Sequence, residues 1–189
     1  MSRALRFALM VISVALAAAL LVSLLSYSQR LYLKKAYPIK YSEYVEKYSQ
    51  EYDLDPYFVY AVIRTESDFT ENATSSIGAR GLMQVTNETF DWIRTKLRDT
   101  ESSFDSMYNA ETAVKYGAYL LFYLKSVLGS EENVLCGYHA GVNRAKQWLS
   151  DEELSENGNI ISEKIPYDDT RAYVDKVMKT YNIYLKLYK

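Results

Sequence analysis

The sequence predicts a mainly α-helical domain that follows a single membrane-spanning helix. Three observations lead to this fold class: a long uncharged run near the N-terminus, apolar residues that recur at helical spacing through the rest of the chain, and a scarcity of the alternating patterns typical of strands. The chain has 189 residues and shows no internal repeats, and single domains commonly contain about 100–150 residues. We therefore expect one helical domain after the N-terminal segment.

The N-terminal segment contains a run of 21 residues, 7–27, without a charge or a proline, and basic side chains flank it on both sides. A bilayer core is spanned by about 20 apolar residues, whereas the apolar region of a secretory signal contains about 7–15. The length therefore favours an uncleaved anchor at 1–28, joined by a tether at 29–40 to a domain at 41–189. The alternative is a signal peptide that is cleaved at the alanines 17–19.

Charge separates the two parts of the chain. Five of the 22 basic residues and none of the 24 acidic ones lie in 1–36, so the rest carries 17 basic against 24 acidic side chains, a net charge of −7. An acidic domain without a basic stripe argues against nucleic acid as a partner. The single cysteine, Cys136, excludes an intramolecular disulfide. No cluster of His, Cys and carboxylates has the spacing of metal ligands, so neither a metal nor a cofactor is expected.

Helix signals recur in order along the domain. Asp55 before Pro56 is typical of an N-cap and a first helical turn, and Gly129 is typical of a residue that ends a helix. The segment 151–164 is rich in acidic residues and contains Asn-Gly-Asn, which predicts an exposed loop. The predicted helices cover residues 41–52, 56–66, 87–97, 109–128, a short stretch around 133–136, and 168–187.

Glu66 is the unusual residue of the predicted helix 56–66. Counting back in fours from Glu66 gives Val62 and Phe58, so the carboxyl group continues the apolar stripe of the helix. It also falls in the last turn, where the negative end of the helix dipole disfavours a carboxylate. A position that is unfavourable for a charged acid indicates a functional reason for keeping the acid there.

Four blocks occur in a fixed order along the domain: Glu-Ser at 66–67, Gly-Leu-Met-Gln at 81–84, Tyr-His-Ala-Gly at 138–141, and IPYDDTRAYVDKV from 165. With these blocks, residues 41–184 resemble the catalytic domain of the soluble-type lytic transglycosylases, which are peptidoglycan-cleaving enzymes with a lysozyme-like fold. The chain departs from the family pattern at His139, where asparagine is usual, and at Asp169, where glutamate is usual.

The resemblance implies a catalytic role for Glu66. As an acid, it protonates the glycosidic oxygen between N-acetylmuramic acid and N-acetylglucosamine. As a carboxylate, it then takes the proton of the muramyl C6 hydroxyl, which closes onto C1 and forms a 1,6-anhydro ring. An acid on an apolar helix face keeps its proton more readily, which suits the first step.

The resemblance also implies a set of residues that contact the substrate. Asp169 and Arg171 have a second interpretation as an ordinary charged pair at a helix start. His139 has one too, since a histidine can act as a general base and activate a water, although we favour a hydrogen-bonding wall of the cleft. The expected substrate-binding residues are Ser75, Gln84, Tyr138, His139, Asp169 and Arg171.

These features predict a lytic transglycosylase anchored in the bacterial cell membrane by a single pass, with its catalytic domain on the extracytoplasmic side. The expected partners are the glycan strands of peptidoglycan and the membrane itself. Two other functions remain open: a hydrolytic muramidase resembling goose-type lysozyme, and a non-catalytic glycan-binding scaffold domain. The position of Glu66 argues against the scaffold, because a binding groove needs no carboxylate in an unfavourable place.

Overall fold

The computed structural model describes residues 2–189 and divides into two compact units, one up to Pro38 and one from Ile39 to Lys189. The first unit is the helix α1 (Arg3–Ala36), none of whose residues is buried. By length and composition, α1 is able to cross a membrane. It extends past the uncharged run into the segment expected to be a tether, and it ends two residues before Pro38, which disfavours a helical residue in front of it.

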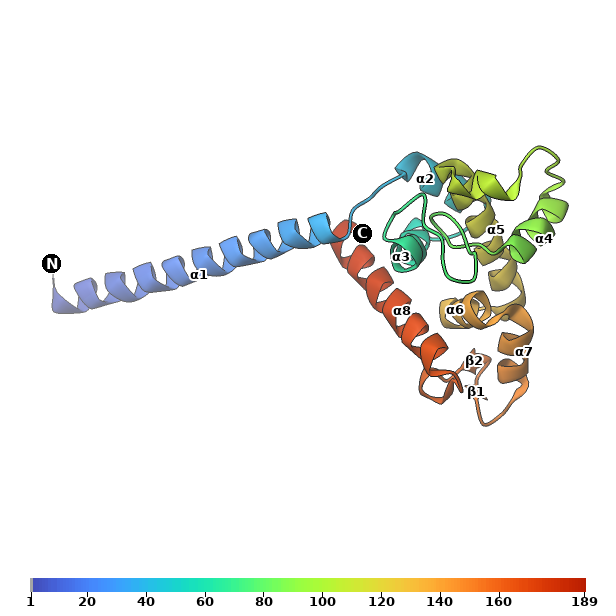
Figure 1. Cartoon of the computed structure of the whole chain (residues 1–189). Coiled ribbons are helices and arrows are strands. Elements are labelled where there is room, and N and C mark those ends of the chain that lie inside the picture. Colours follow the sequence, from blue (N-terminus) through green and yellow to red (C-terminus); the bar gives the residue numbers. More distant parts are fainter. Residues whose placement is uncertain (1) are drawn as a thin grey trace. The chain divides into compact units, whose positions relative to one another are not determined.

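The second unit is almost entirely helical, as the sequence predicts (Figure 1). Its two short strands pair antiparallel as a small hairpin. Its elements are α2 (Ser42–Glu51), α3 (Pro56–Ser67), α4 (Asn87–Leu97), η1 (Phe104–Tyr108), α5 (Ala110–Leu128), α6 (Glu131–Ala140), α7 (Val142–Ser150), β1 (Ser155–Glu156), β2 (Asn159–Ile160), η2 (Ser162–Lys164) and α8 (Asp168–Tyr188).

Local sequence signals set the starts of several helices. The Asp55 side chain accepts a hydrogen bond of 2.8 Å from the backbone N–H of Tyr57, and Pro56 occupies the first turn of α3. Asn109 caps α5 in the same way through the N–H of Thr112, at 3.1 Å. These bonds satisfy backbone donors that a helix leaves without an internal partner, which is why the predicted boundaries of α3 and α5 agree with the observed ones.

Two segments differ from the sequence prediction. The short helix expected around 133–136 is the middle of α6, and a further helix, α7, follows after Gly141, whose φ of +93° separates the two. The expected loop 151–164 contains the β1–β2 hairpin and η2. Asn133 fixes this hairpin, because its Oδ1 accepts from the N–H of Ile160 at 2.9 Å and its Nδ2 donates to the carbonyl of Gly158 at 2.9 Å.

The helix α3 lies in the core and packs along α8 and against α2. Its residues from Phe58 to Ile63 are buried, and the Tyr60 ring stacks on that of Tyr184 in α8 at 5.6 Å between centroids. In Figure 1, α8 is the long red helix that runs along one side of this unit, with α6 next to it. The helix α8 thus contacts both α3 and α6.

Candidate active site

Glu66 occupies the last turn of α3, at a sharp change of chain direction. The two residues after the helix, Asp68 and Phe69, both have left-handed φ angles, 47° and 63°. Phe69 is buried and holds the turn against the core. The hydroxyl of Ser67 donates to the carbonyl of Leu82 at 2.8 Å, which fastens the helix end to the Gly-Leu-Met-Gln turn. The half-buried Glu66 is therefore held at a well-defined position.

The hydroxyl of Tyr173, on α8, donates a hydrogen bond of 2.6 Å to Oε1 of Glu66. Burial raises the pKa of Glu66 to about 7, while this hydrogen bond and the charge of Lys176 act in the opposite direction, since both favour the carboxylate. A carboxyl group with such a pKa is about half protonated at neutral pH. It is therefore able both to give and to take a proton under the same conditions.

Tyr138 lies close to Glu66 but does not bind it. Its hydroxyl donates to the backbone carbonyl of Met83 at 2.6 Å. Burial and the negative charge of Glu66 raise the pKa of Tyr138 well above its usual value, so the phenol stays neutral. Tyr138 is among the residues that the sequence predicts to bind substrate; in the structure, the hydroxyl bonded to the carboxyl group of Glu66 belongs to Tyr173.

Sequence reasoning missed Tyr173, although a signal was present. On α8, Thr170, Tyr173, Val174 and Val177 follow the i, i+3, i+4, i+7 spacing of a buried helix face, and all four are buried. Tyr173 is the large member of this face that carries a polar tip, and buried tyrosine hydroxyls usually find a partner. A buried tyrosine within one of the four sequence blocks was therefore a reasonable candidate for contact with Glu66.

The Gly-Leu-Met-Gln turn depends on Gly81. Its φ is +75°, and an added Cβ atom would lie 1.9 Å from the carbonyl oxygen of Met107. Gln84, with a φ of 48°, uses its side-chain nitrogen within the turn, donating to the carbonyls of Gly81 at 2.9 Å and Ala73 at 3.2 Å. The Gln84 amide group thus shapes the turn beside Glu66. Met83 is fully buried and packs against Gly117.

Ser75 lies in the loop between Glu66 and this turn. Its hydroxyl accepts a hydrogen bond of 3.0 Å from the N–H of Ala79, and its own N–H donates to the carbonyl of Ala79 at 3.0 Å. Within residues 2–189, Ser75 makes no hydrogen bond to Glu66. The contacts of Ser75 close the loop, and its half-exposed side chain remains accessible from solvent.

His139 contacts both Tyr173 and Thr170 on α8. The His139 ring is exposed to solvent and stacks on the Tyr173 ring, with 4.6 Å between centroids and 29° between planes. Nδ1 of His139 lies 3.0 Å from Oγ1 of Thr170. The N–H of Thr170 donates to Oδ1 of Asp169 at 2.7 Å. These contacts join the histidine that departs from the family pattern to the tyrosine that binds Glu66.

Arg171 and Asp169 have contacts of the kind expected at a helix start. Arg171 forms an ion pair with Asp168 and donates to the carbonyl of Glu163 at 3.0 Å, so it holds the start of α8 to η2. Asp169 is exposed and lines a hollow together with His139. A molecule that binds in this hollow would therefore contact both His139 and Asp169, whereas Arg171 does not line the hollow.

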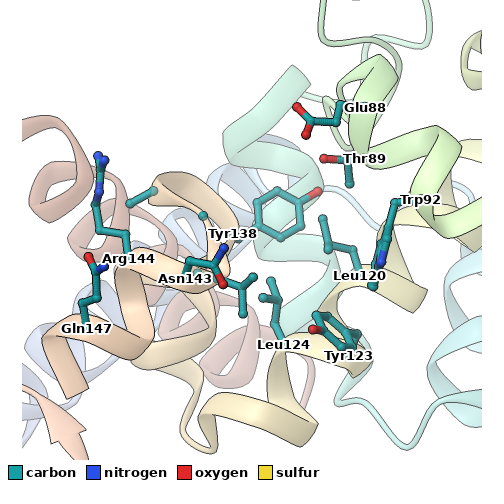
Figure 2. Close-up of a pocket in the computed structure, with 14 residues that line it drawn as sticks. Glu88, Thr89, Trp92, Leu120, Tyr123, Leu124, Tyr138, Asn143, Arg144 and Gln147 are labelled. Atoms are coloured by element: carbon teal, nitrogen blue, oxygen red, sulfur yellow. The ribbon is translucent and has the colours of Figure 1, made fainter. Parts of the chain in front are cut away.

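A second hollow of about 660 Å³ opens next to Tyr138 (Figure 2). One wall is apolar and aromatic, and Figure 2 shows Glu88 and Thr89 toward one end, with Arg144 and Gln147 toward the other. Tyr138 contributes to this hollow and also lies within the electrostatic influence of Glu66. The apolar wall consists of Trp92, Leu120, Tyr123 and Leu124.

Comparison with known proteins gives consistent results. Residues 43–161 match the Transglycosylase SLT domain family. The soluble lytic murein transglycosylase of Escherichia coli is 25% identical over 159 residues, which are 83% of this chain and 24% of that protein. The membrane-bound lytic murein transglycosylase C of Sodalis glossinidius is 29% identical over 159 residues, 73% of this chain and 44% of that protein.

A solved structure shows the same fold. An inactive glutamate-to-glutamine mutant of the lytic transglycosylase Slt from Pseudomonas aeruginosa matches with a TM-score of 0.74 and 26% sequence identity, over 82% of this chain and 25% of that one. The chain thus spans about a quarter of the length of this structure and of the soluble relative. The family match covers more than half of the chain and includes Glu66, the Gly-Leu-Met-Gln turn and Tyr138. The chain therefore belongs to the Transglycosylase SLT domain family.

Proposed function

We propose that this protein is a peptidoglycan lytic transglycosylase that cleaves the β-1,4 bond between N-acetylmuramic acid and N-acetylglucosamine without water and leaves 1,6-anhydromuramyl ends. The observation that carries the proposal is the half-buried Glu66, with a pKa of about 7 and a 2.6 Å hydrogen bond from Tyr173. The names of the relatives, lytic murein transglycosylases, support the same substrate and reaction. The solved Pseudomonas relative was inactivated by a glutamate-to-glutamine change, which is consistent with a glutamate as the central group.

In the first step, protonated Glu66 gives its proton to the glycosidic oxygen. The bond from that oxygen to C1 of the muramyl sugar breaks, its electron pair stays with the oxygen, and positive charge develops at C1. The N-acetylglucosamine part leaves with a new 4-hydroxyl group. The hydrogen bond from Tyr173 stabilises the carboxylate that forms on Glu66, because the phenol donates to it.

In the second step, the Glu66 carboxylate takes the proton from the C6 hydroxyl of the same muramyl sugar while O6 bonds to C1. Glu66 returns to its protonated form, and no water is consumed. The C6 hydroxyl is tethered to the reacting sugar, so its attack avoids the entropy cost of ordering a free water. One carboxyl group with a pKa near neutral is sufficient for both proton transfers.

The hollow next to Tyr138 is a suitable place for further sugars of the strand. Its aromatic wall, with Trp92 and Tyr123, offers flat surfaces for the apolar faces of sugar rings. Asn143 and Gln147 line the same hollow and offer amide groups to the N-acetyl substituents. We propose that the strand runs from Glu66 past Tyr138 into this hollow.

A hydrolytic muramidase is the second candidate, and the surroundings of Glu66 disfavour it. Hydrolysis commonly uses a second carboxylate about 5–10 Å from the acid. A like charge at that range raises the pKa of its neighbour, but no carboxylate in residues 2–189 contributes to the raised pKa of Glu66. Asp68, the acid next but one in the chain, is exposed and paired with Arg64.

Product analysis tests the proposal. Purified peptidoglycan is digested with the protein, and the new muramyl ends are examined by mass spectrometry before and after borohydride treatment. We expect fragments lighter than hydrolysis products by one water, with ends that borohydride leaves unchanged. Reducible muramyl ends would establish a muramidase, and binding without cleavage by a folded sample would establish the glycan-binding scaffold.

We further propose that α1 anchors the domain to the bacterial cell membrane by a single pass, with the domain on the extracytoplasmic side. The length and apolar composition of α1 and the membrane-bound relative support this location. In cell fractions, the intact protein is expected in the membrane pellet with its N-terminus retained. A soluble protein that begins near residue 19 would instead identify the apolar run as a cleaved signal.

A further inference from the structure

We propose that His139 is a positioning residue, which holds Tyr173 in hydrogen-bonding contact with Glu66. This role deepens the proposed function and rests on it. It differs from both functions that the sequence suggests for His139, a wall that binds substrate and a general base that activates water. It also gives a physical consequence to the replacement of the usual asparagine by histidine.

The contact between the two rings is the first observation. Tyr173 is 9% exposed, and the His139 ring lies on its face with 4.6 Å between centroids. The other end of the Tyr173 side chain is fixed by its 2.6 Å bond to Glu66. His139 itself is exposed, so its ring stands between Tyr173 and solvent. An asparagine has no ring with which to make this stack.

The second observation is that the His139 ring is itself held in place. Nδ1 lies 3.0 Å from Oγ1 of Thr170, a residue that is 1% exposed. Thr170 and Tyr173 are three residues apart on α8 and therefore present their side chains on the same face. The helix thus contacts His139 twice, at the edge of the ring through Thr170 and at its face through Tyr173. A ring held at two points restricts the motion of Tyr173 more than a free side chain does.

The charged groups near this cluster lie on several elements. Lys176, on α8, acts on Glu66. The hollow beside His139 is bounded by Asp168 and Asp169 from the start of α8 and by Arg144 from α7. Glu66 does not line that hollow, and the residue bonded to Glu66 is Tyr173. His139 therefore reaches the reacting acid through Tyr173.

The arrangement makes a specific functional prediction. The hydrogen bond from Tyr173 favours the carboxylate form of Glu66, so weakening it raises the pKa of Glu66. Cleavage requires the protonated acid, and activity is lost as pH rises through that pKa. Loosening Tyr173 therefore moves the alkaline limb of the pH profile of kcat/KM to higher pH. It also lowers kcat, because the carboxyl group is oriented less well.

The experiment measures kcat, KM and the pH profile of kcat/KM on soluble glycan fragments for the full-length protein and its variants. Tyr173→Phe removes the hydrogen bond and is expected to cause the largest upward shift of the alkaline limb. The shift should be about one to two pH units, which corresponds to a hydrogen bond to a charged group. His139→Ala is expected to shift the limb in the same direction by a smaller amount and to lower kcat. His139→Phe keeps a flat ring over Tyr173 but loses the contact with Thr170, so its alkaline limb is expected to shift less than that of His139→Ala.

A double-mutant cycle tests whether His139 acts through Tyr173. In the Tyr173→Phe background, His139→Ala is expected to cause no further shift, because the bond that it positions is absent. Two matched controls lie outside the site. Tyr181→Phe removes a comparable phenol on α8 that binds Asp55 at 3.1 Å, and Phe122→Ala removes an exposed ring on α5. Both are expected to leave the pH profile unchanged.

Three results would overturn the proposal. Loss of activity in folded His139→Phe, together with reducible products from the wild type, would make His139 a general base. A raised KM in His139→Ala with an unmoved alkaline limb would make it a substrate contact. An additive shift in the double mutant would show that it acts independently of Tyr173. Failure of the proposed function would appear separately, as full activity in Glu66→Gln or as hydrolytic products from the wild type. The position of the alkaline limb does not depend on which product forms, so the two proposals can be tested independently.

Discussion

Tyr173 donates a 2.6 Å hydrogen bond to Oε1 of Glu66, although the two residues are 107 positions apart in the chain. The bond opposes the effect of burial, which favours the neutral acid. Burial without this bond would hold the proton on Glu66 too tightly for transfer to the glycosidic oxygen. A solvent-exposed acid would instead lose its proton to water before the reaction. The balance between the two effects holds the pKa of Glu66 at about 7, in the range useful for an acid that later acts as a base.

The first prediction concerns the pH dependence of cleavage. Because the proposed first step needs protonated Glu66, whose pKa is about 7, kcat/KM is expected to fall about tenfold for each pH unit well above neutral. The measurement is the initial rate of release of soluble fragments between pH 5 and 9, with protein stability verified at each pH. A rate that stays constant up to pH 9 would mean that the proton comes from a group other than Glu66.

The second prediction is that Glu66→Gln abolishes cleavage and stabilises the fold at high pH. The amide cannot exchange a proton, but its oxygen still accepts the bond from Tyr173. In the unfolded chain, glutamate loses its proton near pH 4.5, whereas the folded protein holds it until about pH 7. The wild type therefore loses stability as pH rises between these values, by up to about 3 kcal/mol, and the variant does not.

The measurement for this second prediction is the difference in Tm between Glu66→Gln and the wild type. It is expected to be small at pH 4.5 and to grow to several degrees at pH 8, since about 1 kcal/mol shifts Tm by about 2–4 °C in a domain of this size. Glu132→Gln, in the first turn of α6, supplies a control that removes one acid elsewhere. A Tm difference that is independent of pH would indicate an ordinary exposed glutamate at position 66.

The third prediction separates the two tyrosines near Glu66. Tyr138→Phe removes the donor to the Met83 carbonyl, which is expected to cost about 1–3 kcal/mol because a buried acceptor loses its partner. The Tm should fall, while the alkaline limb of kcat/KM should stay in place, because Tyr138 does not bind the carboxyl group. Urea unfolding and the pH profile, measured on the same samples, check both parts. A limb that moves as far as in Tyr173→Phe would give Tyr138 the role that the structure assigns to Tyr173.

Local signals made part of the fold and of the candidate site predictable. Asp55 with Pro56 and the glycine at 129 mark helix ends through backbone bonds formed within a few residues, so α3 and α5 were located well. Glu66 stands out as a candidate because an acid on an apolar stripe is visible in the helical period alone. The mainly helical fold followed from the same periodicity, and the structure confirms it.

The remaining features depend on contacts between distant segments. The bond from Tyr173 to Glu66 exists because α8 packs on α3, and no local pattern specifies that pairing. The β1–β2 hairpin likewise depends on Asn133, which binds Ile160 from 27 residues away. For an acidic segment with few apolar residues, a loop was the natural prediction, since its structure comes from one buried amide side chain and not from a periodic pattern of its own.

The last prediction concerns the turn beside Glu66 and compares two glycines that both have positive φ. An alanine at Gly81 would place its Cβ atom 1.9 Å from the Met107 carbonyl oxygen, whereas an added Cβ atom at Gly78 meets nothing within 4 Å. Gly78→Ala is therefore expected to cost only the backbone strain, about 1–2 kcal/mol. Gly81→Ala is expected to cost at least about 2 kcal/mol more, because η1 must move away from the turn. That movement also displaces Met83 and Gln84, so kcat should fall much further in Gly81→Ala than in Gly78→Ala when both are measured below their unfolding temperatures. Equal losses of stability in the two variants would show that the turn is not held against η1 in solution.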